Sequence, residues 1–281
     1  MTDVAPSLWL CSVQFLGLAI GVVVVTRYLV LAGLEQLSRA YGVSGKLQGQ
    51  LLGYATSVPE LVGTSATAVR GLLGAGLWNV AASNIINCGL FLAAALYFRR
   101  GHTILQRRFA GEICFALVAV AVPLALATQT SWARSPWTAG LLVAFFVIYL
   151  LVDRKLNTHE ASGEETASIE LGASPSAGLA GVAKLVAGLL GIVVIGHFLG
   201  SVAEVIVVAL EIPEAAVGWV LGVVTSLPEM TTFFVVFASA RGASDGNAAT
   251  QRSLDNLAAS NMSNVALIYP IGIVLFLLAT T

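Results

Sequence analysis

The sequence has few charged side chains. Asp, Glu, Lys and Arg make up 10% of its 281 residues, whereas 57% of the residues are hydrophobic. A soluble globular chain carries about 25% charged residues, so this composition excludes an ordinary soluble domain. The formal net charge is only −1, and no basic stretch is interleaved with aromatic residues, so no nucleic-acid partner is expected. Most of the chain should instead be solvated by a lipid bilayer.

Cysteine and histidine are also scarce, with three residues of each. The cysteines form no CxxC pair, so neither a disulfide framework nor a thiolate metal site is expected; they are Cys11, Cys88 and Cys114. The histidines lie far apart in the sequence and form no HExxH motif; they are His102, His159 and His197. Together with the lack of a nucleotide-binding motif, this indicates that the protein is not an enzyme and needs no cofactor.

Long apolar segments are what the sequence has in abundance. Eight of them can be distinguished, and most are long enough to cross a bilayer as helices. They cover residues 12–38, 46–70, 75–98, 110–128, 136–153, 178–210, 214–240 and 253–279. We therefore predict an all-α membrane protein with about eight transmembrane helices. A polar stretch divides the chain, which predicts a first half (1–153, five spans), a linker (154–177) and a second half (178–281, three spans).

The basic residues of the loops predict the orientation. If all eight segments span the membrane, most of the loop Lys and Arg residues fall on the side of the linker: Arg39, Lys46, Arg99, Arg100, Arg107, Arg108, Arg154, Lys155, Lys184, Arg241 and Arg252. Only Arg70 and Arg134 fall on the other side. Because positive loops stay cytoplasmic, the linker 154–177 should be cytoplasmic and both termini extracytoplasmic. Short loops and the lack of a regulatory domain favour a prokaryotic inner cell membrane.

Two sequence blocks match each other. GYATSVPELV begins at Gly53 and is followed by NVAASNIINCGL; GVVTSLPEMT begins at Gly222 and is followed by NLAASNMSNVAL. The equivalent segments 46–70 and 214–240 are the second and the seventh span, and this odd difference of five means that the two copies cross the membrane in opposite directions. Inverted repeats of this kind are typical of transporters, whose binding sites lie near the bilayer midplane between the repeats.

The residues of these motifs suit a cation. Glu60 and Glu229 lie inside apolar segments, where a charge costs at least about 2.5–3.5 kcal/mol, so a soluble cation is their natural counter-charge. Pro59 and Pro228 remove a helical donor and so free the carbonyls of Ala55 and Val224. In each SNxxN motif the Ser and the second Asn are spaced i,i+4 and share a helix face. Carboxylate, hydroxyl, amide and carbonyl oxygens are the ligands of hard cations such as Ca²⁺ and Na⁺.

Other polar residues of the apolar segments are expected to be structural. Asn84 and Asn261 should form hydrogen bonds between helices. The remaining ones are predicted to be wetted at span ends (Glu35 and Glu204), structural (Arg27), satisfied by packing (His197) or solvated at the start of a helix (Asp255).

At the two repeats the sequence resembles the calcium/cation antiporter superfamily, and within it the sodium/calcium exchanger family, whose repeats read roughly GTSxPE and GSNIxN or GSNIxD. The resemblance covers nearly the whole chain. It implies ten helices, ions bound between helices 2, 3, 7 and 8, and alternating access by movement of helices 1 and 6. The ion ligands that it implies are Thr56, Ser57, Glu60, Ser83, Asn87, Thr225, Ser226, Glu229, Ser260 and Asn264.

The sequence departs from the family pattern in three ways. Alanine or valine replaces the motif glycines, at Ala55, Val224, Ala82 and Ala259. Asn264 stands where sodium exchangers commonly have aspartate. The sequence ends after the eighth segment, so the last two family helices have no counterpart, and a second copy or a partner protein could cover the surface that they would cover.

The expected function is secondary active antiport of Ca²⁺ against Na⁺. Two carboxylates balance one Ca²⁺, whereas three Na⁺ would leave a net positive charge in a site of low dielectric constant. We therefore expect fewer than three Na⁺ per Ca²⁺, or proton coupling through Glu60 and Glu229. Two alternatives stay open: a Ca²⁺/H⁺ antiporter that uses the same site, and a non-coupled cation-binding or channel protein.

Overall fold

The computed structural model describes residues 4–42, 44–157, 175–210, 213–240 and 243–280, which form helices and no strand. The helices, in chain order, are α1 (Val4–Val25), η1 (Thr26–Leu31), α2 (Ala32–Tyr41), α3 (Gly45–Thr56), α4 (Val58–Val69), α5 (Leu73–Tyr97), α6 (Gly101–Ile104), η2 (Arg107–Phe109), α7 (Ala110–Ala127), α8 (Thr130–Ala133), α9 (Pro136–Asn157), α10 (Pro175–Leu210), α11 (Glu214–Thr225), α12 (Leu227–Ser239), α13 (Ala243–Ser263), η3 (Asn264–Ile268) and α14 (Tyr269–Thr280).

Seven helical stretches in the described part of the chain are long and apolar enough to cross a membrane. They are Trp9–Tyr41, Leu73–Tyr97, Arg107–Ala127, Pro136–Lys155, Gly178–Leu199, Glu214–Ser239 and Gly246–Thr280. The prediction of an all-α membrane protein is therefore confirmed. The remaining predicted segment, 46–70, folds as the two short helices α3 and α4.

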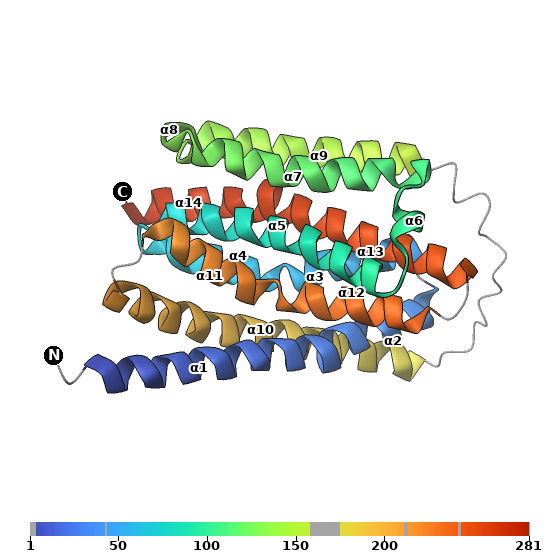
Figure 1. Ribbon diagram of the computed structural model, residues 1–281, viewed down its shortest axis with the longest axis horizontal. Coiled ribbons are helices and arrows are strands. Elements are labelled where there is room, and N and C mark those ends of the chain that lie inside the picture. The colour runs from blue at the N-terminus through green and yellow to red at the C-terminus, as the bar shows by residue number, and fades with distance from the viewer. Residues whose placement is uncertain (1–3, 43, 158–174, 211–212, 241–242, 281) are drawn as a thin grey trace.

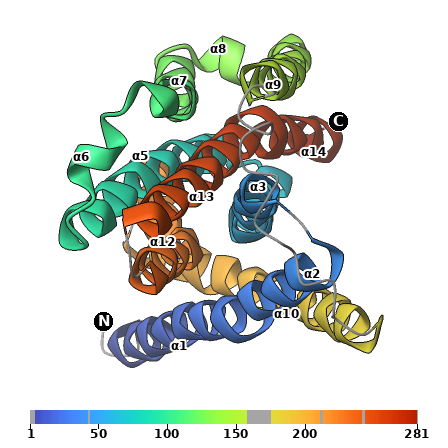
Figure 2. The ribbon, with the colours of Figure 1, turned by 90° about the vertical axis from the view of Figure 1, so that its right-hand side faces the viewer.

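The helices lie in three layers, which Figures 1 and 2 show from two directions. A central layer holds α3, α4, α5 and α11 to α14. The long α1–α2 stretch and α10 pack against each other on one side of it, and α7, α8 and α9 cover the other side. Both repeat motifs therefore belong to the central layer, where they are shielded on two sides.

The chain termini lie at one end of the molecule, and α9 ends and α10 begins at the other end (Figure 1). Two predicted boundaries were wrong. Residues 154–157 and 175–177, assigned to the linker, continue α9 and α10; linker residues 158–174 lie outside the described residues. Residues 243–252, expected to be a polar connection, form the first turns of α13, because their polar side chains are compatible with a helix whose ends lie beyond the apolar region.

The two repeats have the same break in the helix. α3 ends and α4 begins around Ser57 (φ −82°, ψ 0°), and α11 ends and α12 begins around Ser226 (φ −81°, ψ 0°). Pro59 and Pro228 then occupy the first turn of the new helix, where a missing N–H costs no hydrogen bond. A helix break next to the motif proline is thus present at the same place in both copies.

Glycines let each broken helix approach the long helix of the other repeat. A Cβ on Gly53 would lie 2.5 Å from the Asn256 carbonyl oxygen, so α3 lies directly on α13. A Cβ on the equivalent Gly222 would lie 2.9 Å from the Ser83 nitrogen, so α11 lies directly on α5. Small residues permit such close approach between membrane helices, and here they bring the TSxPE breaks against the SNxxN helices.

Candidate cation-binding site

All ten residues predicted as ion ligands are buried in the central layer. None of their side chains is more than 2% exposed. They come from the two helix breaks and from α5, α13 and η3: Thr56, Ser57, Glu60, Ser83, Asn87, Thr225, Ser226, Glu229, Ser260 and Asn264. Residues up to 208 positions apart in sequence are therefore candidates for one site, and their hydrogen bonds define how they meet.

Each carboxylate is paired with the serine of its own repeat. The Ser83 hydroxyl donates to Glu60 Oε1 at 2.6 Å, and the Ser260 hydroxyl donates to Glu229 Oε1 at 3.0 Å. Hydrogen bonds to an ionised acceptor are the shorter and stronger kind. Each carboxylate thus has one oxygen held by a hydroxyl group.

The same two serines join the repeats to each other. Ser57 Oγ lies 2.9 Å from Ser260 Oγ, and the Ser226 hydroxyl donates to Ser83 Oγ at 3.1 Å. Every helix break therefore contacts the serine of the opposite repeat while that serine holds the carboxylate of its own. The pairing follows the inverted symmetry of the sequence.

The amides of the two SNxxN motifs form hydrogen bonds with one another. Asn87 Nδ2 donates to Asn261 Oδ1 at 3.2 Å, and Asn264 Nδ2 donates to Asn84 Oδ1 at 2.9 Å. Asn84 and Asn261 each also donate to the other's backbone carbonyl at 3.2 Å. The prediction that Asn84 and Asn261 form interhelical hydrogen bonds is confirmed, and they also orient the amides of Asn87 and Asn264.

Four oxygens of this network are buried yet have no hydrogen-bond partner among the described residues. They are Glu60 Oε2, Glu229 Oε2, Asn87 Oδ1 and Asn264 Oδ1. An unsatisfied buried polar group costs about 1–3 kcal/mol, and more when it is charged. Two carboxylate and two amide oxygens are also a ligand set that hard cations prefer. The residues thus fit a dehydrated cation as the transported substrate.

A protein-family match that covers nearly the whole chain shows which family the sequence belongs to. The family described as "Sodium/calcium exchanger protein" matches residues 11–153 and 180–279, which include both repeats. The chain belongs to the sodium/calcium exchanger family. It is accordingly a multi-pass membrane cation exchanger rather than an enzyme, it uses no cofactor, and cations are its cargo. No curated protein matches the sequence.

Solved structures of the sodium-calcium exchanger NCX_Mj share the fold of this family member. One, soaked with 2.5 mM Na⁺ and 1 mM Sr²⁺, has a TM-score of 0.57 at 21% identity over 98% of this chain and 83% of that one. Another, soaked with 10 mM Na⁺ and zero Ca²⁺, has a TM-score of 0.58 at 20% identity over 95% and 83% of the two chains. At this identity the likeness concerns the fold.

The hydroxyls of the two motif threonines donate to groups outside the network of serines and SNxxN amides. The Thr225 hydroxyl donates to Asn79 Oδ1 at 3.4 Å, whereas the Thr56 hydroxyl donates to the Leu52 carbonyl of its own helix at 2.9 Å. The Thr225 side chain nevertheless lies close to the Glu60 carboxylate, and the Thr56 side chain lies close to that of Glu229.

Asn79 and Ser263 also contact residues of this network, and sequence reasoning did not single them out. Asn79 Nδ2 donates to the Glu60 carbonyl at 3.4 Å, and the Ser263 hydroxyl donates to Ser57 Oγ at 3.4 Å. Asn79 and Asn256 occupy equivalent places at the start of the two matched blocks, so their repetition was an available signal. Ser263 has no counterpart of its kind, because Ile86 stands in the first repeat.

Two of the minor predictions were wrong. Asp255 is 2% exposed rather than solvated, because α13 starts twelve residues earlier and carries Asp255 into the protein; Gln251 Nε2 donates to it at 3.0 Å and to Glu112 at 3.1 Å. His197 is exposed, because it lies on the outward face of α10. Glu35 is exposed as predicted, Arg27 is exposed too, and the side chain of Glu204 lies outside the described residues.

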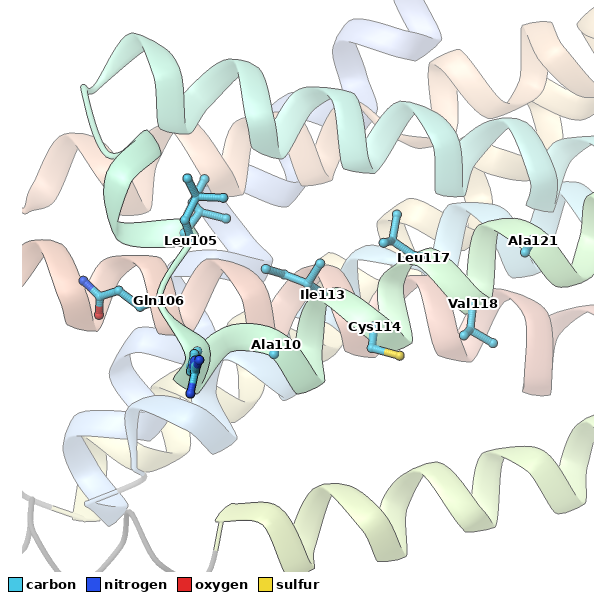
Figure 3. A pocket seen from close by; sticks show the side chains of 10 residues that line it. Leu105, Gln106, Ala110, Ile113, Cys114, Leu117, Val118 and Ala121 are labelled. Carbon is cyan, nitrogen blue, oxygen red and sulfur yellow. The ribbon is translucent and has the colours of Figure 1, made fainter.

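A surface groove of about 620 Å³ lies elsewhere, along α6, η2 and α7 (Figure 3). Its lining is mostly apolar, with Ile113, Leu117 and Val118 among the residues that line it, and it contains no carboxylate. None of its lining residues belongs to the candidate cation-binding site. It offers no ligand set for a cation, and Arg107 in its wall would repel one.

Proposed function

We propose that the protein is a secondary active antiporter that exchanges Ca²⁺ for Na⁺ by alternating access. Its ions would bind at the two TSxPE and two SNxxN motifs, with the ten buried residues of the candidate site as ligands. The observation that carries this proposal is the set of four buried oxygens without a hydrogen-bond partner, two of which belong to carboxylates.

The two carboxylates supply the charge that a Ca²⁺ ion requires. One oxygen of each is held by Ser83 or Ser260, which fixes the carboxylate and leaves its second oxygen for the ion. The amide oxygens of Asn87 and Asn264 add neutral ligands. A Na⁺ ion would use the same kinds of oxygen, so competition for shared ligands provides the basis of exchange.

The layer of α1, η1, α2 and α10 is the candidate moving part. A Cβ on Gly33 would lie 2.8 Å from the Leu185 nitrogen, and one on Gly188 would lie 2.8 Å from Val30, so these long helices pack tightly on each other. Their motion as a pair across the central layer would expose the site first to one side of the membrane and then to the other.

The charge of the site limits the coupling ratio. Asn264 contributes a neutral amide whose nitrogen donates to Asn84, so Glu60 and Glu229 remain the carboxylates of the ligand set. Three Na⁺ would leave one uncompensated positive charge. We expect fewer than three Na⁺ per Ca²⁺. The same two carboxylates make Ca²⁺/H⁺ antiport the second candidate, because protons can neutralise them in place of Na⁺.

The orientation in the membrane follows from the basic loops. The end of the molecule where α9 ends and α10 begins would face the cytoplasm, with both termini on the opposite side of an inner cell membrane.

Calcium uptake into proteoliposomes tests the proposed function. Uptake is measured with an imposed sodium gradient, with a pH gradient and with neither. We expect sodium-driven uptake that is lost in Glu60→Gln and in Glu229→Gln. Glu35→Gln is the matched control, because Glu35 is an exposed carboxylate. Calcium uptake by this variant should equal that of the wild type.

Each other outcome identifies a different transporter. Uptake driven by pH alone assigns the Ca²⁺/H⁺ alternative, and uptake without any counter-ion gradient assigns a non-coupled pathway. Electrogenic exchange of three Na⁺ per Ca²⁺ would refute the proposed coupling ratio. Unchanged uptake in both glutamate variants would refute the site.

A further inference from the structure

The two repeats match at the carboxylates but differ one turn before the motif serines. Asn79 precedes Ser83 by four residues on α5, and Asn256 precedes Ser260 by four residues on α13. Both amides are fully buried. Asn79 is well bonded: it donates to Thr64 Oγ1 at 3.1 Å, and Thr225 donates to its Oδ1 at 3.4 Å.

Asn256 has none of these partners. Both its Oδ1 and its Nδ2 are buried without a hydrogen bond among the described residues, and so is the hydroxyl of Ser253, three positions earlier. The sequence explains the difference. The residue equivalent to Thr64 is Phe233, which has no polar atom, and the hydroxyl of Thr56 donates within its own helix rather than across to Asn256.

The equivalent of Ser253 is Gly76, and there the first repeat is closed. A Cβ on Gly76 would lie 3.1 Å from Thr64 and from Thr67, so a side chain there would have to displace these threonines. In the second repeat the same place carries a hydroxyl group. In the described residues, the position one turn before the motif serine therefore carries unbonded polar atoms in the second repeat, where it is Asn256, and not in the first, where it is Asn79.

The spacing of these residues places them on the same helix face as Ser260, which belongs to the candidate cation-binding site. Ser253, Asn256 and Ser260 are spaced i, i+3 and i+7, so they share one face of α13. Asn256 lies about 6 Å from Ser260 along the helix axis, and Ser253 about 10 Å. α13 starts at the end of the molecule where α9 ends, so both residues lie between the site and that end (Figure 1).

We propose that Ser253 and Asn256 form an additional binding position for a partly hydrated monovalent cation. Na⁺ would pass through this position between the candidate cation-binding site and the end of the molecule where α9 ends and α10 begins, called here the linker end. The hydroxyl and the amide oxygen are neutral ligands, which do not balance a divalent charge. A water of the hydrated ion would accept the hydrogen bond of Asn256 Nδ2. The first repeat has no such position on the opposite side. This inference rests on the proposed exchange of Na⁺.

Asn256→Leu tests the position. Replacing a buried amide that has no partner by an apolar side chain of similar size should leave the fold intact. The measurement is the rise of the thermal unfolding midpoint with NaCl, with choline chloride keeping the ionic strength constant. Ligand linkage predicts that the variant needs about five-fold more Na⁺, or more still, for half of the rise, whereas its response to Ca²⁺ stays that of the wild type. Ser253→Ala should shift the sodium response in the same direction.

Thr250→Val is the matched control, because Thr250 is buried on the same helix but its hydroxyl already donates to the Gly246 carbonyl at 2.8 Å. Its sodium response should not change. Transport in membrane vesicles of both orientations then tests the side: Asn256→Leu should raise the half-saturating Na⁺ concentration at the linker end alone.

An unchanged sodium response in Asn256→Leu and Ser253→Ala overturns the inference, and so does an equal change at both membrane faces. Failure of the proposed function is distinct, since it would show in the wild type as the lack of sodium-driven calcium uptake. The thermal response to Na⁺ does not depend on transport and tests the position in either case.

Discussion

Ser83 and Ser260 each connect three parts of the site with a single hydroxyl group. Ser83 donates its proton to Glu60 and accepts from Ser226, and Ser260 donates to Glu229 and lies against Ser57. Because a hydroxyl has one proton and two lone pairs, donation to the carboxylate fixes the direction of the other contacts. These serines therefore position the carboxylates as well as providing candidate ligands.

Removing one of these hydroxyls should weaken ion binding. Ser83→Ala deletes the 2.6 Å hydrogen bond to Glu60 and leaves the Ser226 hydroxyl without its acceptor. A hydrogen bond to a charged group contributes about 1.5–3 kcal/mol, so the half-saturating Ca²⁺ concentration should rise about ten-fold or more. Calcium titration of exchange measures it. Ser239→Ala is the control and should behave as the wild type, because the Ser239 hydroxyl donates to the Val236 carbonyl and to no other group among the described residues.

A third carboxylate should change the coupling. Asn264→Asp adds a negative charge beside Glu60 and Glu229, so the site would balance one more Na⁺. We expect the variant to exchange more Na⁺ per Ca²⁺ and to respond to the membrane potential more strongly than the wild type. The current carried per Ca²⁺ in proteoliposomes measures this, and an identical current in both proteins would contradict the charge argument.

At the scale of the helices, the broken pairs are positioned by contacts with the other repeat. α3 lies on α13, and α11 lies on α5, so each TSxPE break meets the SNxxN helix that comes from the other half of the chain. Glycine on one side of each contact permits this distance. The site is thus formed by the contact between the repeats and not by either repeat alone.

Gly53→Ala should push α3 and α13 apart at one of these contacts. The added Cβ would lie 2.5 Å from the Asn256 carbonyl oxygen and 2.8 Å from the Ser260 nitrogen, and neither backbone atom can move without its helix. Although alanine favours helix, overpacking costs about 1–3 kcal/mol. We expect a lower unfolding midpoint and a weaker calcium response. Gly140→Ala, where the Cβ meets no atom within 4 Å, should keep both values or raise the midpoint slightly.

At the scale of the whole molecule, the outer pair of long helices packs on the central layer at several places. One of them joins α10 to α4, where a Cβ on Gly196 would lie 3.3 Å from the Cβ of Val62. A pair of cysteines with Cβ atoms about 3.5–4.5 Å apart can form a disulfide after a small adjustment. This contact therefore allows the two layers to be tied together.

Oxidation of the double variant Val62→Cys and Gly196→Cys, in a background without the three native cysteines, should stop exchange if the outer pair moves across the central layer. Calcium binding should persist, since neither position belongs to the candidate site, and reduction should restore exchange. The single variant Val62→Cys provides the control for oxidation itself. Full exchange by the cross-linked protein would rule out this motion.

Several features could be predicted from the sequence because they depend on local chemistry. Proline has no N–H to donate within a helix, which accords with the breaks beside Pro59 and Pro228, and a glutamate in an apolar segment requires a partner in any fold. The repeat of TSxPE and SNxxN predicted the ten buried residues, although it did not predict that the Thr56 hydroxyl would donate to its own helix and the Thr225 hydroxyl to Asn79. Helix ends were less predictable: polar residues 243–252 have no apolar periodicity, yet they form part of α13.

The sequence by itself determined the membrane class, the inverted repeat and the residue types of the site, because composition, hydropathy and repetition are properties of the chain alone. Tertiary structure decided which parts of the two repeats contact each other. Ser57 pairs with Ser260 and Ser226 with Ser83, so each pair joins residues more than 140 positions apart. It also decided that Asp255 is buried and that Asn79 is bonded while Asn256 is not. Hydrogen bonding depends on what stands across a helix contact, and the residue across from each of these side chains comes from a distant part of the chain.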